Sequence, residues 1–379
     1  MFIGPAFALG ERQTGEIDPF DLRECSGEEL REDLAHLKGI VDSQHPKLYT
    51  DREAWDRRHA ELYERAGGGM DELEFYRALA PLVADLNCGH TMVALPVDWD
   101  ERPGSPRVFP PLRVIVRDGK LLLVEMFSGV SVPASSEIVS INGMSGAEIL
   151  SRLEDVILSD GYNVTHKHAI LSRAFASEFA RYIQSSTRYV VEYLAPGADS
   201  PKTETVAGVT METVWRQNQC DASREEDLQY RFEDEYAVLT VRSFNYYSPS
   251  ELREFRSFID GFFQEVPAHD TETLILDLRG NGGGSPHAAV HLLRYLIREP
   301  VPYFSRTGGP GYSDLRAEQT PYEGAFTGEV YAVIDGRTFS TSGHFCALLD
   351  YHGLARFVGE ESGGSYICTD SVLEYTVSL

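Results

Sequence analysis

A glycine-rich turn is the first stretch of the chain whose residues could do chemistry. The letters DLRGNGGG at residues 277–284 begin within a short run at 274–278 that is mostly apolar and predicts a buried strand. Glycines leave backbone N–H groups bare, so such a turn can hold a phosphate or stabilise an oxyanion. The phosphate interpretation is weak, because neither GxxxxGKS/T nor a complete GxGxxG is present. A tight turn with only a structural role is the other interpretation.

Ser340 is the second candidate. The letters TFSTSGH at 338–344 follow a predicted strand at 330–334 and open a predicted helix at 340–351. A serine at the start of a helix is most often only its N-cap. A nucleophile in that place would gain from the helix dipole, and nearby backbone N–H groups could stabilise a developing oxyanion. No GxSxG surrounds Ser340, which disfavours an α/β-hydrolase of the usual kind.

His90 is the third candidate, within NCGHT at 87–91. We expect Gly89 to cap the preceding helix and His90 to follow directly. A lone histidine in that place is more often a surface or packing residue, but an imidazole can also serve as a general base near neutral pH. No HExxH or similar spacing predicts a metal site, and nothing in the sequence implies an organic cofactor.

Composition restricts the class of protein. The 379 residues carry a net charge of −25, with 59 acidic against 34 basic residues, so a nucleic-acid partner is disfavoured. The length predicts two or three domains, and 42% hydrophobic residues exclude a disordered or fibrous chain. No apolar run approaches the ~20 residues of a membrane helix, which disfavours an integral membrane protein.

The cysteines and the N-terminus add little. The cysteines are Cys25, Cys88, Cys220, Cys346 and Cys368. Their odd number and the lack of a CxxC pair predict buried thiols rather than a disulfide framework or a zinc site. We assign residues 1–25 to an N-terminal extension or the remnant of a signal peptide. Its apolar stretch at 6–8 lacks the basic region of a complete signal, so the residues themselves leave the compartment open.

The first half of the chain predicts a helical bundle and a small β domain. Residues 26–91 hold three amphipathic helices, with N-terminal signals at Ser26, Thr50 and Asp71, each followed three residues later by a glutamate. Residues 92–160 predict a β domain, with a hairpin around Asp118-Gly119, a strand at 137–142 and a helix at 147–157. Residues 161–227 predict a connecting helix and strand, with a linker at 196–205.

The second half, residues 228–379, alternates strands and helices. Strands are predicted at 236–241, 274–278, 330–334 and 355–358, and the helices between them begin near Ser248, His287 and Ser340. Such alternation is typical of parallel βαβ units. The predicted fold class is therefore a multidomain α+β protein with an α/β core.

Together these motifs resemble the C-terminal processing peptidases, or tail-specific serine proteases. DLRGNGGG is similar to the family's D-L-R-x-N-x-G-G signature, and residues 330–360 are similar to its nucleophile segment. The β domain, with EIVSING at 137–143, resembles a PDZ-like module, and the helical block ending in GHT resembles the family's N-terminal bundle. The resemblance spans residues 26–379 and implies a crotonase/ClpP-like βαβ core.

The resemblance also implies roles for individual residues. Ser340 matches the nucleophile, while the amides of Thr341 and Gly283 match the oxyanion hole. Attack by Ser340 on a peptide carbonyl would form an acyl-enzyme that water then releases.

The general base departs from the best-known branch of the family. There a lysine 25 residues after the serine is the base, but Ser365 occupies that position and no lysine follows Lys202. Gly343 and Tyr351 also replace acidic residues of that branch. The chain is closer to the tricorn-like and retinoid-binding-protein-like branch, whose base is a histidine of the N-terminal part. This resemblance implies His90, with His344 and His352 as alternatives.

The third catalytic group and the end of the chain are linked. In the tricorn branch the acid that orients the histidine follows the nucleophile at a distance beyond residue 379. Among the acids present we choose Glu360, with Glu361 and Asp370 as alternatives. We expect a strand over 370–379, and the chain is expected to be truncated there, because the family continues with further strands.

The predicted function is a serine-type endopeptidase acting on protein or peptide chains. The alternatives are a non-catalytic relative that binds a peptide or lipid, and a hydrolase of small esters or amides on the same scaffold. Residues 129–136 lack a glycine pair, so recognition of substrate C-termini does not follow. The family resemblance favours a periplasmic or extracellular location.

Overall fold

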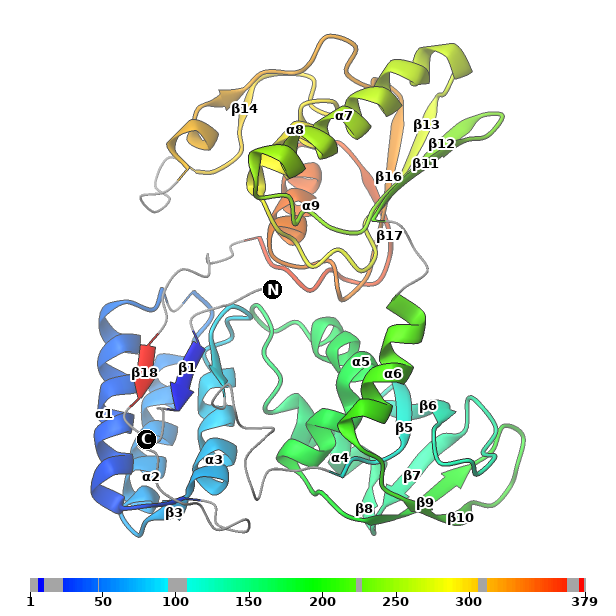
Figure 1. Cartoon of the computed structure of the whole chain (residues 1–379). Helices are drawn as coiled ribbons and strands as arrows, with labels where there is room; N and C mark the ends of the chain where they lie inside the picture. The colour runs from blue at the N-terminus through cyan, green and yellow to red at the C-terminus, as the bar shows by residue number, and fades with distance from the viewer. Residues whose placement is uncertain are drawn as a thin grey trace. The chain divides into compact units, whose positions relative to one another are not determined.

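The computed structural model describes residues 6–9, 23–46, 48–94, 108–222, 227–305, 312–366 and 375–377. The chain forms two compact units (Figure 1). Unit 1 comprises Met1–Arg224 and Thr369–Leu379, and unit 2 comprises Glu225–Cys368. Both units mix helices and sheets, which confirms the predicted α+β class. Among the described residues, no helix is both long and apolar enough to cross a bilayer.

Unit 1 begins with three helices, as the sequence predicts. The capping boxes at Ser26 and Asp71 both form, each with its glutamate side chain accepting from the N-cap backbone. Each helix buries one apolar face. The helices are α1 (Gly27–Ser43), α2 (Arg52–Ala66) and α3 (Glu72–Ala84).

The predicted N-cap of the second helix is wrong by one residue. The Asp51 carboxylate accepts from the Ala54 N–H at 3.1 Å, so Asp51 caps α2. The Thr50 hydroxyl instead donates to the Leu86 carbonyl at 2.8 Å. Either side chain can cap a helix, and a tertiary contact decided between them.

An antiparallel sheet forms the β-rich part of unit 1. Its order is β10-β9-β7-β6-β5, with β8 paired to β7. The predicted hairpin turns at Asp118 and Gly119, whose φ angles of 51° and 70° are those of a type I′ turn. The strands are β5 (Leu112–Arg117), β6 (Lys120–Met126), β7 (Glu137–Ile141), β8 (Met144–Ser145), β9 (Arg188–Leu194) and β10 (Lys202–Ala207).

This sheet continues beyond the predicted end of the β domain at residue 160. The predicted linker at 196–205 is wrong in its second half, because residues 202–207 form β10 and pair antiparallel with β9. Only Val206 of β10 is buried, so an edge strand with polar residues has the composition of a loop. Three helices accompany the sheet: α4 (Gly146–Glu154), α5 (Thr165–Tyr182) and α6 (Met211–Ala222).

A large hydrophobic cluster joins the two parts of unit 1. This cluster runs from Leu30 and Phe75 of the helices to Ile141, Phe179 and Val191 of the β-rich part, and a separate smaller cluster lies around Phe109. The bundle and the β-rich part are therefore packed as one body rather than as two separately cored domains.

Two short sheets complete unit 1. Strand β1 (Ala6–Leu9) lies between β4 (Met92–Ala94) and β18 (Tyr375–Val377), parallel to both. Part of the segment assigned to an extension or signal remnant thus forms a strand. The strand predicted over 370–379 is described only at 375–377. Strand β2 (Glu24–Cys25) pairs antiparallel with β3 (Met70–Asp71).

Unit 2 contains a five-stranded sheet of order β11-β12-β13-β16-β17. All neighbours are parallel except β11 and β12, which confirms the predicted βαβ pattern. The strands are β11 (Leu228–Phe232), β12 (Tyr236–Val241), β13 (Thr273–Asp277), β16 (Glu329–Ile334) and β17 (Arg356–Gly359).

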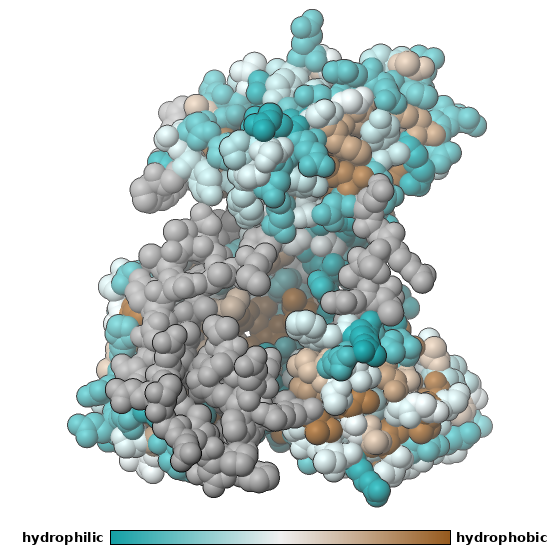
Figure 2. Space-filling model, viewed as in Figure 1, coloured by the Kyte–Doolittle hydropathy of each residue, from teal (hydrophilic) through white to brown (hydrophobic). Residues whose placement is uncertain are grey.

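Three helices connect these parallel strands: α7 (Pro249–Glu265), α8 (Pro286–Leu293) and α9 (Thr341–Tyr351). Helix α8 contacts both α7 and α9 (Figure 1). Polar residues cover most of the face of unit 2 seen in Figure 2. The shorter elements of unit 2 are η2 (Val266–His269), β14 (Val301–Pro302), η3 (Ser313–Arg316) and β15 (Glu318–Gln319).

This topology places two candidate segments together. The glycine-rich turn follows β13, and the Ser340 segment follows the neighbouring strand β16. Parallel strands present their carboxyl ends at one edge of a sheet, which is where α/β proteins place their ligands.

The cap of α7 gives a stability test. The Ser248 hydroxyl accepts from the Glu251 N–H, and the Glu251 carboxylate accepts from the Ser248 N–H. We expect Ser248→Ala to lower the free energy of unfolding by about 1 kcal/mol, because a helix N–H loses its acceptor. Hydrogen exchange in α7 measures this loss. Tryptophan fluorescence would not report on it, because all three tryptophans precede unit 2. Ser257→Ala, at an exposed position of the same helix, is the control and should leave exchange unchanged. Equal protection in both variants would contradict the prediction.

Candidate active site

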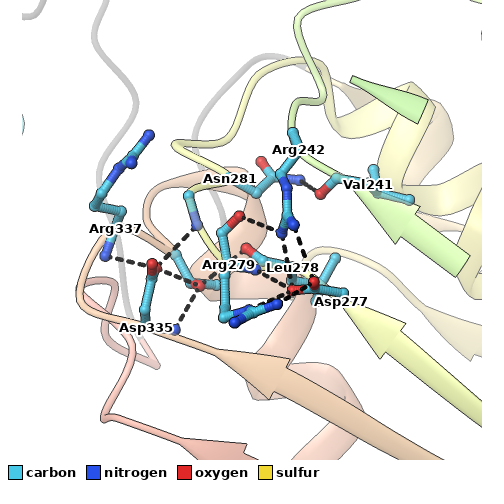
Figure 3. A network of polar contacts seen from close by, with 10 residues as sticks. Val241, Arg242, Asp277, Leu278, Arg279, Asn281, Asp335 and Arg337 are labelled. Carbon is cyan, nitrogen blue, oxygen red and sulfur yellow. Dashed lines mark hydrogen bonds and ion pairs between the residues drawn. The ribbon is translucent and has the colours of Figure 1, made fainter. Parts of the chain in front are cut away.

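A buried carboxylate anchors the start of the glycine-rich turn. Asp277, the last residue of β13, accepts from Arg242 at 2.9 and 3.0 Å and from Arg279 at 2.7 and 2.9 Å (Figure 3). Burial of Asp277 favours its neutral form, but hydrogen bonds from Arg279 and Arg242 outweigh this and lower its pKa to about 2. The Arg242 guanidinium also donates to the Arg279 carbonyl at 2.9 Å. The Asp277 and Arg279 residues of the DLR motif therefore fix the start of the turn to the sheet.

Asn281 shapes the turn itself. Its Nδ2 donates to the Val241 carbonyl at 3.0 Å, and its Oδ1 accepts the Gly283 N–H at 2.9 Å. Its own carbonyl accepts the Phe339 N–H at 3.0 Å. This fully buried asparagine thus ties the turn both to β12 and to the Ser340 segment.

Asp335, labelled in Figure 3, and Thr338 also link the two segments. The Asp335 carboxylate accepts the N–H groups of Gly280 and Arg337, each at 3.0 Å. The Thr338 hydroxyl donates to the Leu278 carbonyl at 3.1 Å. Together with the Asn281 bonds, these contacts fix the positions of the two turns relative to each other.

Ser340 does not cap the helix that it precedes. It occupies the N-cap position of α9, but its side chain makes no capping hydrogen bond. Its backbone lies at φ 55°, ψ −127°, a conformation that costs a non-glycine residue roughly 1–3 kcal/mol. The interpretation of Ser340 as an ordinary N-cap is therefore wrong. Strain of this size persists only where the surroundings fix the conformation, and it clusters at functional sites.

Gly283 lies directly against Ser340 and Thr341. A Cβ at residue 283 would come within 2.7 Å of the Ser340 Cβ and 2.8 Å of the Thr341 nitrogen, and the φ of Gly283 is +100°. The structure thus brings together the predicted nucleophile and both residues predicted for the oxyanion hole.

The two predicted oxyanion donors differ in their bonding. The Gly283 N–H is engaged by Asn281 Oδ1 at 2.9 Å. The Thr341 N–H, at the first residue of α9, donates to no atom of the described residues, while its hydroxyl donates to the Gly284 carbonyl at 2.5 Å.

Close packing leaves no room for an acidic side chain at Gly343, the position where the branch of the family with a serine–lysine dyad carries one. A Cβ at Gly343 would lie 2.7 Å from the Gly364 Cα, and one at Gly364 would lie 3.3 Å from the Ser340 nitrogen. The Gly364 N–H donates to the Thr338 carbonyl at 3.1 Å. The segment that carries Ser365 in place of the dyad lysine therefore packs against the start of α9.

His344 and His352 are poorly arranged as bases for Ser340. His344 Nε2 is 2.9 Å from the Tyr303 carbonyl. A carbonyl only accepts, so Nε2 carries a proton in this contact. Burial also lowers the pKa of His344. His352 is the C-cap of α9, and the rise of the helix places it ~18 Å along the axis from Ser340.

His90 lies in unit 1, in the loop between α3 and β4. The prediction that Gly89 caps α3 is wrong: Asp85 is the C-cap, and Asn87 takes the left-handed conformation with φ 51°. Asparagine tolerates that region because its short polar side chain bonds locally, here to the Asp85 carbonyl, and it also donates to the distant Tyr49 carbonyl. His90 itself is 4% exposed.

Asp160 lies beside His90 and was missed by the sequence analysis. The Asp160 Oδ1 is 3.8 Å from His90 Nδ1 and accepts the Gly89 N–H at 2.8 Å. The adjacent Gly161 N–H donates to the Asn87 carbonyl at 2.9 Å. In the sequence, an aspartate before a glycine reads as a surface turn, and its pairing with residues 70 positions upstream leaves no local signal.

The acids considered from the sequence stand elsewhere. Glu360 and Glu361 are exposed on the segment after β17 in unit 2, and the Glu360 N–H donates to the Ile334 carbonyl at 3.2 Å. Asp370 lies outside the described residues. Among the described residues, no hydrogen bond or ion pair links Glu360 to a histidine.

Cysteine is disfavoured as an alternative nucleophile. Cys25, Cys88 and Cys346 are buried, as predicted, while the side chains of Cys220 and Cys368 are outside the described structure. Burial raises the pKa of Cys25 to about 11 and that of Cys346, on α9, to about 12. Such thiols stay protonated at neutral pH and react slowly.

A family model matches part of the second half of the chain. Residues 235–372 match the family model described as peptidase family S41. This match agrees with the resemblance predicted from the motifs and supports a peptidase. No curated protein matches the chain.

Solved structures show a similar fold. Mature CPAF is 13% identical with a TM-score of 0.58, and the match covers 89% of this chain and 84% of that one. A CPAF mutant matches with a TM-score of 0.59 at 12% identity, over 89% of this chain and 84% of that chain. Mature CPAF in complex with lactacystin gives 0.58 at 13% identity, over 89% and 85%. At this identity the likeness concerns the fold alone.

The ion pairs of Asp277 predict a pH-dependent contribution to stability. We expect Asp277→Asn to lower the free energy of unfolding at pH 7 by about 2 kcal/mol, because the pKa of this carboxyl falls from near 3.9 in the unfolded chain to about 2. A depressed carboxyl pKa stabilises the fold above the unfolded pKa, and this contribution is lost as pH falls through about 2. Urea unfolding of both proteins from pH 7 to pH 2 measures it. A difference independent of pH would contradict the assignment.

Two neighbouring glycines give a matched test of the turn. Gly283→Ala should cost at least ~1–2 kcal/mol, because the new methyl meets Ser340 and the backbone has a positive φ. Gly282→Ala should be tolerated, since a Cβ there has no heavy atom within 4 Å. Thermal unfolding compares the two variants. Equal melting temperatures would argue against the close approach of residue 283 to Ser340.

Proposed function

We propose that the protein is a serine-type endopeptidase in which Ser340 is the nucleophile and His90 the general base. In this mechanism His90 removes the hydroxyl proton as Ser340 attacks a peptide carbonyl. The protonated imidazole then gives the proton to the leaving amine, and an acyl-enzyme remains on Ser340. Water, activated by the same imidazole, releases the acyl group.

The negative charge of the tetrahedral intermediate would be stabilised at the start of α9. The Thr341 N–H is one proposed donor, and the positive end of the helix dipole adds to it. The Gly283 N–H is the second, and it must exchange its bond to Asn281 for one to the oxyanion. Both donors belong to segments held by the hydrogen bonds of Asn281 and Asp335.

The observation that carries this proposal is the conformation of Ser340. A serine kept only to cap α9 would have an extended backbone and accept a helix N–H, and Ser340 does neither. Its strained backbone packs against Gly283, so closely that there is no room for a side chain at residue 283. The absence of a lysine after residue 202 supports a histidine as the base.

The substrates we propose are protein or peptide chains. A PDZ-like role for the sheet of unit 1 would use an edge strand, β5 or β10, for pairing with an extended peptide. The alternative of a small-ester hydrolase is separated by comparing turnover of casein with that of nitrophenyl esters.

Labelling by a fluorophosphonate tests the nucleophile and the base. We expect labelling of the wild type and none of Ser340→Ala, because only the activated serine reacts. His90→Ala should lower the labelling rate at least ~10²-fold, the usual contribution of a general base.

Matched controls exist for both substitutions. Ser342 is buried two residues away, and its hydroxyl has no hydrogen-bond partner among the described residues, so Ser342→Ala should label normally. His352→Ala at the far end of α9 should do the same. Full labelling and turnover of His90→Ala would reject His90 as the base and direct attention to His344. A folded wild type that neither labels nor cleaves casein would favour a non-catalytic binding relative.

A further inference from the structure

We infer that Asp160 is the positioning acid of His90, the residue that orients its imidazole. This inference rests on the proposed function, in which His90 is the general base. From the sequence, we expect this acid after Ser340, at Glu360, with Glu361 and Asp370 as alternatives. The structure points instead to a residue between α4 and α5 of unit 1.

The Asp160 carboxylate lies close to one nitrogen of the His90 ring, and both side chains are buried. His90 Nδ1 and Asp160 Oδ1 are 3.8 Å apart, and their side chains are 5% and 3% exposed. At this distance a small rotation of either side chain would form a hydrogen bond. Water has little access to either group, so an interaction between them is screened far less than at the surface.

The bonding of the carboxylate also calls for a donor. Asp160 Oδ1 accepts the Gly89 N–H at 2.8 Å. The other oxygen, Oδ2, is buried and has no hydrogen-bond partner among the described residues. A buried carboxylate oxygen without a donor is costly, and such cases in native proteins mark functional groups. In this inference, a side-chain rotation in the working enzyme lets the Nδ1–H of His90 donate to this carboxylate, which the imidazole already approaches at Oδ1.

The surrounding backbone holds the two residues in place. The loop of His90 and the loop of Asp160 exchange hydrogen bonds, Gly89 N–H to Asp160 and Gly161 N–H to the Asn87 carbonyl. The Thr91 hydroxyl, next to His90, is 3.1 Å from His45 Nε2. On the other side Asn163 Oδ1 accepts the His166 N–H and so fastens the Asp160 loop to the start of α5. Both loops are anchored at two points.

This pairing has a definite chemical consequence. A hydrogen bond from Nδ1–H to Asp160 keeps the proton on Nδ1 and leaves Nε2 bare to accept the serine proton. The carboxylate also stabilises the imidazolium that forms during attack. Asp160 itself touches neither substrate nor the reacting atoms, so its role is positioning.

Asp160→Asn is the informative variant. The amide oxygen can still accept the Gly89 N–H, so the loop is preserved, while the charge and one acceptor are lost. We expect kcat to fall roughly 10²- to 10⁴-fold, as in serine peptidases whose orienting acid becomes an amide, with KM nearly unchanged. A merely structural role would instead lower stability and leave the kcat of the folded fraction intact.

Two variants serve as controls. Asp155→Asn changes an exposed aspartate five residues earlier, at the end of α4, and should keep full kcat. Glu360→Gln tests the acid chosen from the sequence and should also keep it. Loss of kcat in Glu360→Gln with full kcat in Asp160→Asn would overturn the inference.

A proton NMR measurement separates this inference from the proposed function, because it needs no turnover. The wild type should show a low-field imidazole N–H resonance that disappears in both His90→Gln and Asp160→Asn, with circular dichroism unchanged. A His90 resonance unaffected by Asp160→Asn would overturn the inference whether or not the protein is a peptidase. Failure of wild type to label with a fluorophosphonate would count against the proposed function alone.

Discussion

The buried ion pairs of Asp277 are the interaction on which the rest of the core site depends. Two arginines hold this carboxylate at the end of β13, and their attraction exceeds the cost of its burial, as its low pKa indicates. The backbone leaves the sheet from this point, and Asn281 turns it toward the Ser340 segment. Every later contact, including the approach of Gly283 to Ser340, starts from that fixed end. The anchor is electrostatic, so it depends on pH where an apolar anchor would not.

Close backbone packing is the second constraint. Gly283 lies against Ser340 on one side, and Gly343 meets Gly364 on the other. Between them the serine backbone takes a conformation that an isolated chain would avoid. The hydrogen bonds of Asn281, Asp335 and Thr338 over-determine that conformation. The same packing excludes an acidic side chain at 343, so this core has no space for the charged partner that accompanies a lysine base.

The family match covers only part of the proposed mechanism. The match to the model of peptidase family S41 begins at residue 235, so His90 and Asp160 lie outside it. The nucleophile half of the site is supported by motif, packing and family alike. The base half is supported by local geometry: two buried side chains, reciprocal backbone bonds and a carboxylate oxygen in need of a donor. The proposed nucleophile lies in unit 2 and the proposed base in unit 1, and each is held by contacts within its own unit.

The sequence by itself determined the features that depend on local signals. Capping boxes at Ser26, Asp71 and Ser248, the Asp118-Gly119 hairpin and the alternation of unit 2 all form, because each rests on residues near one another in the chain. The family motifs likewise located Ser340 and the glycine-rich turn.

Only the tertiary structure decided which of two equivalent local signals acts. In the folded chain Asp51 rather than Thr50 caps α2, a polar segment forms strand β10, and Ser340 does not serve as the N-cap that its position alone would allow. The tertiary structure also placed Asp160 beside His90. Seventy residues separate that pair, and burial, which makes the interaction matter, exists only once the chain has folded.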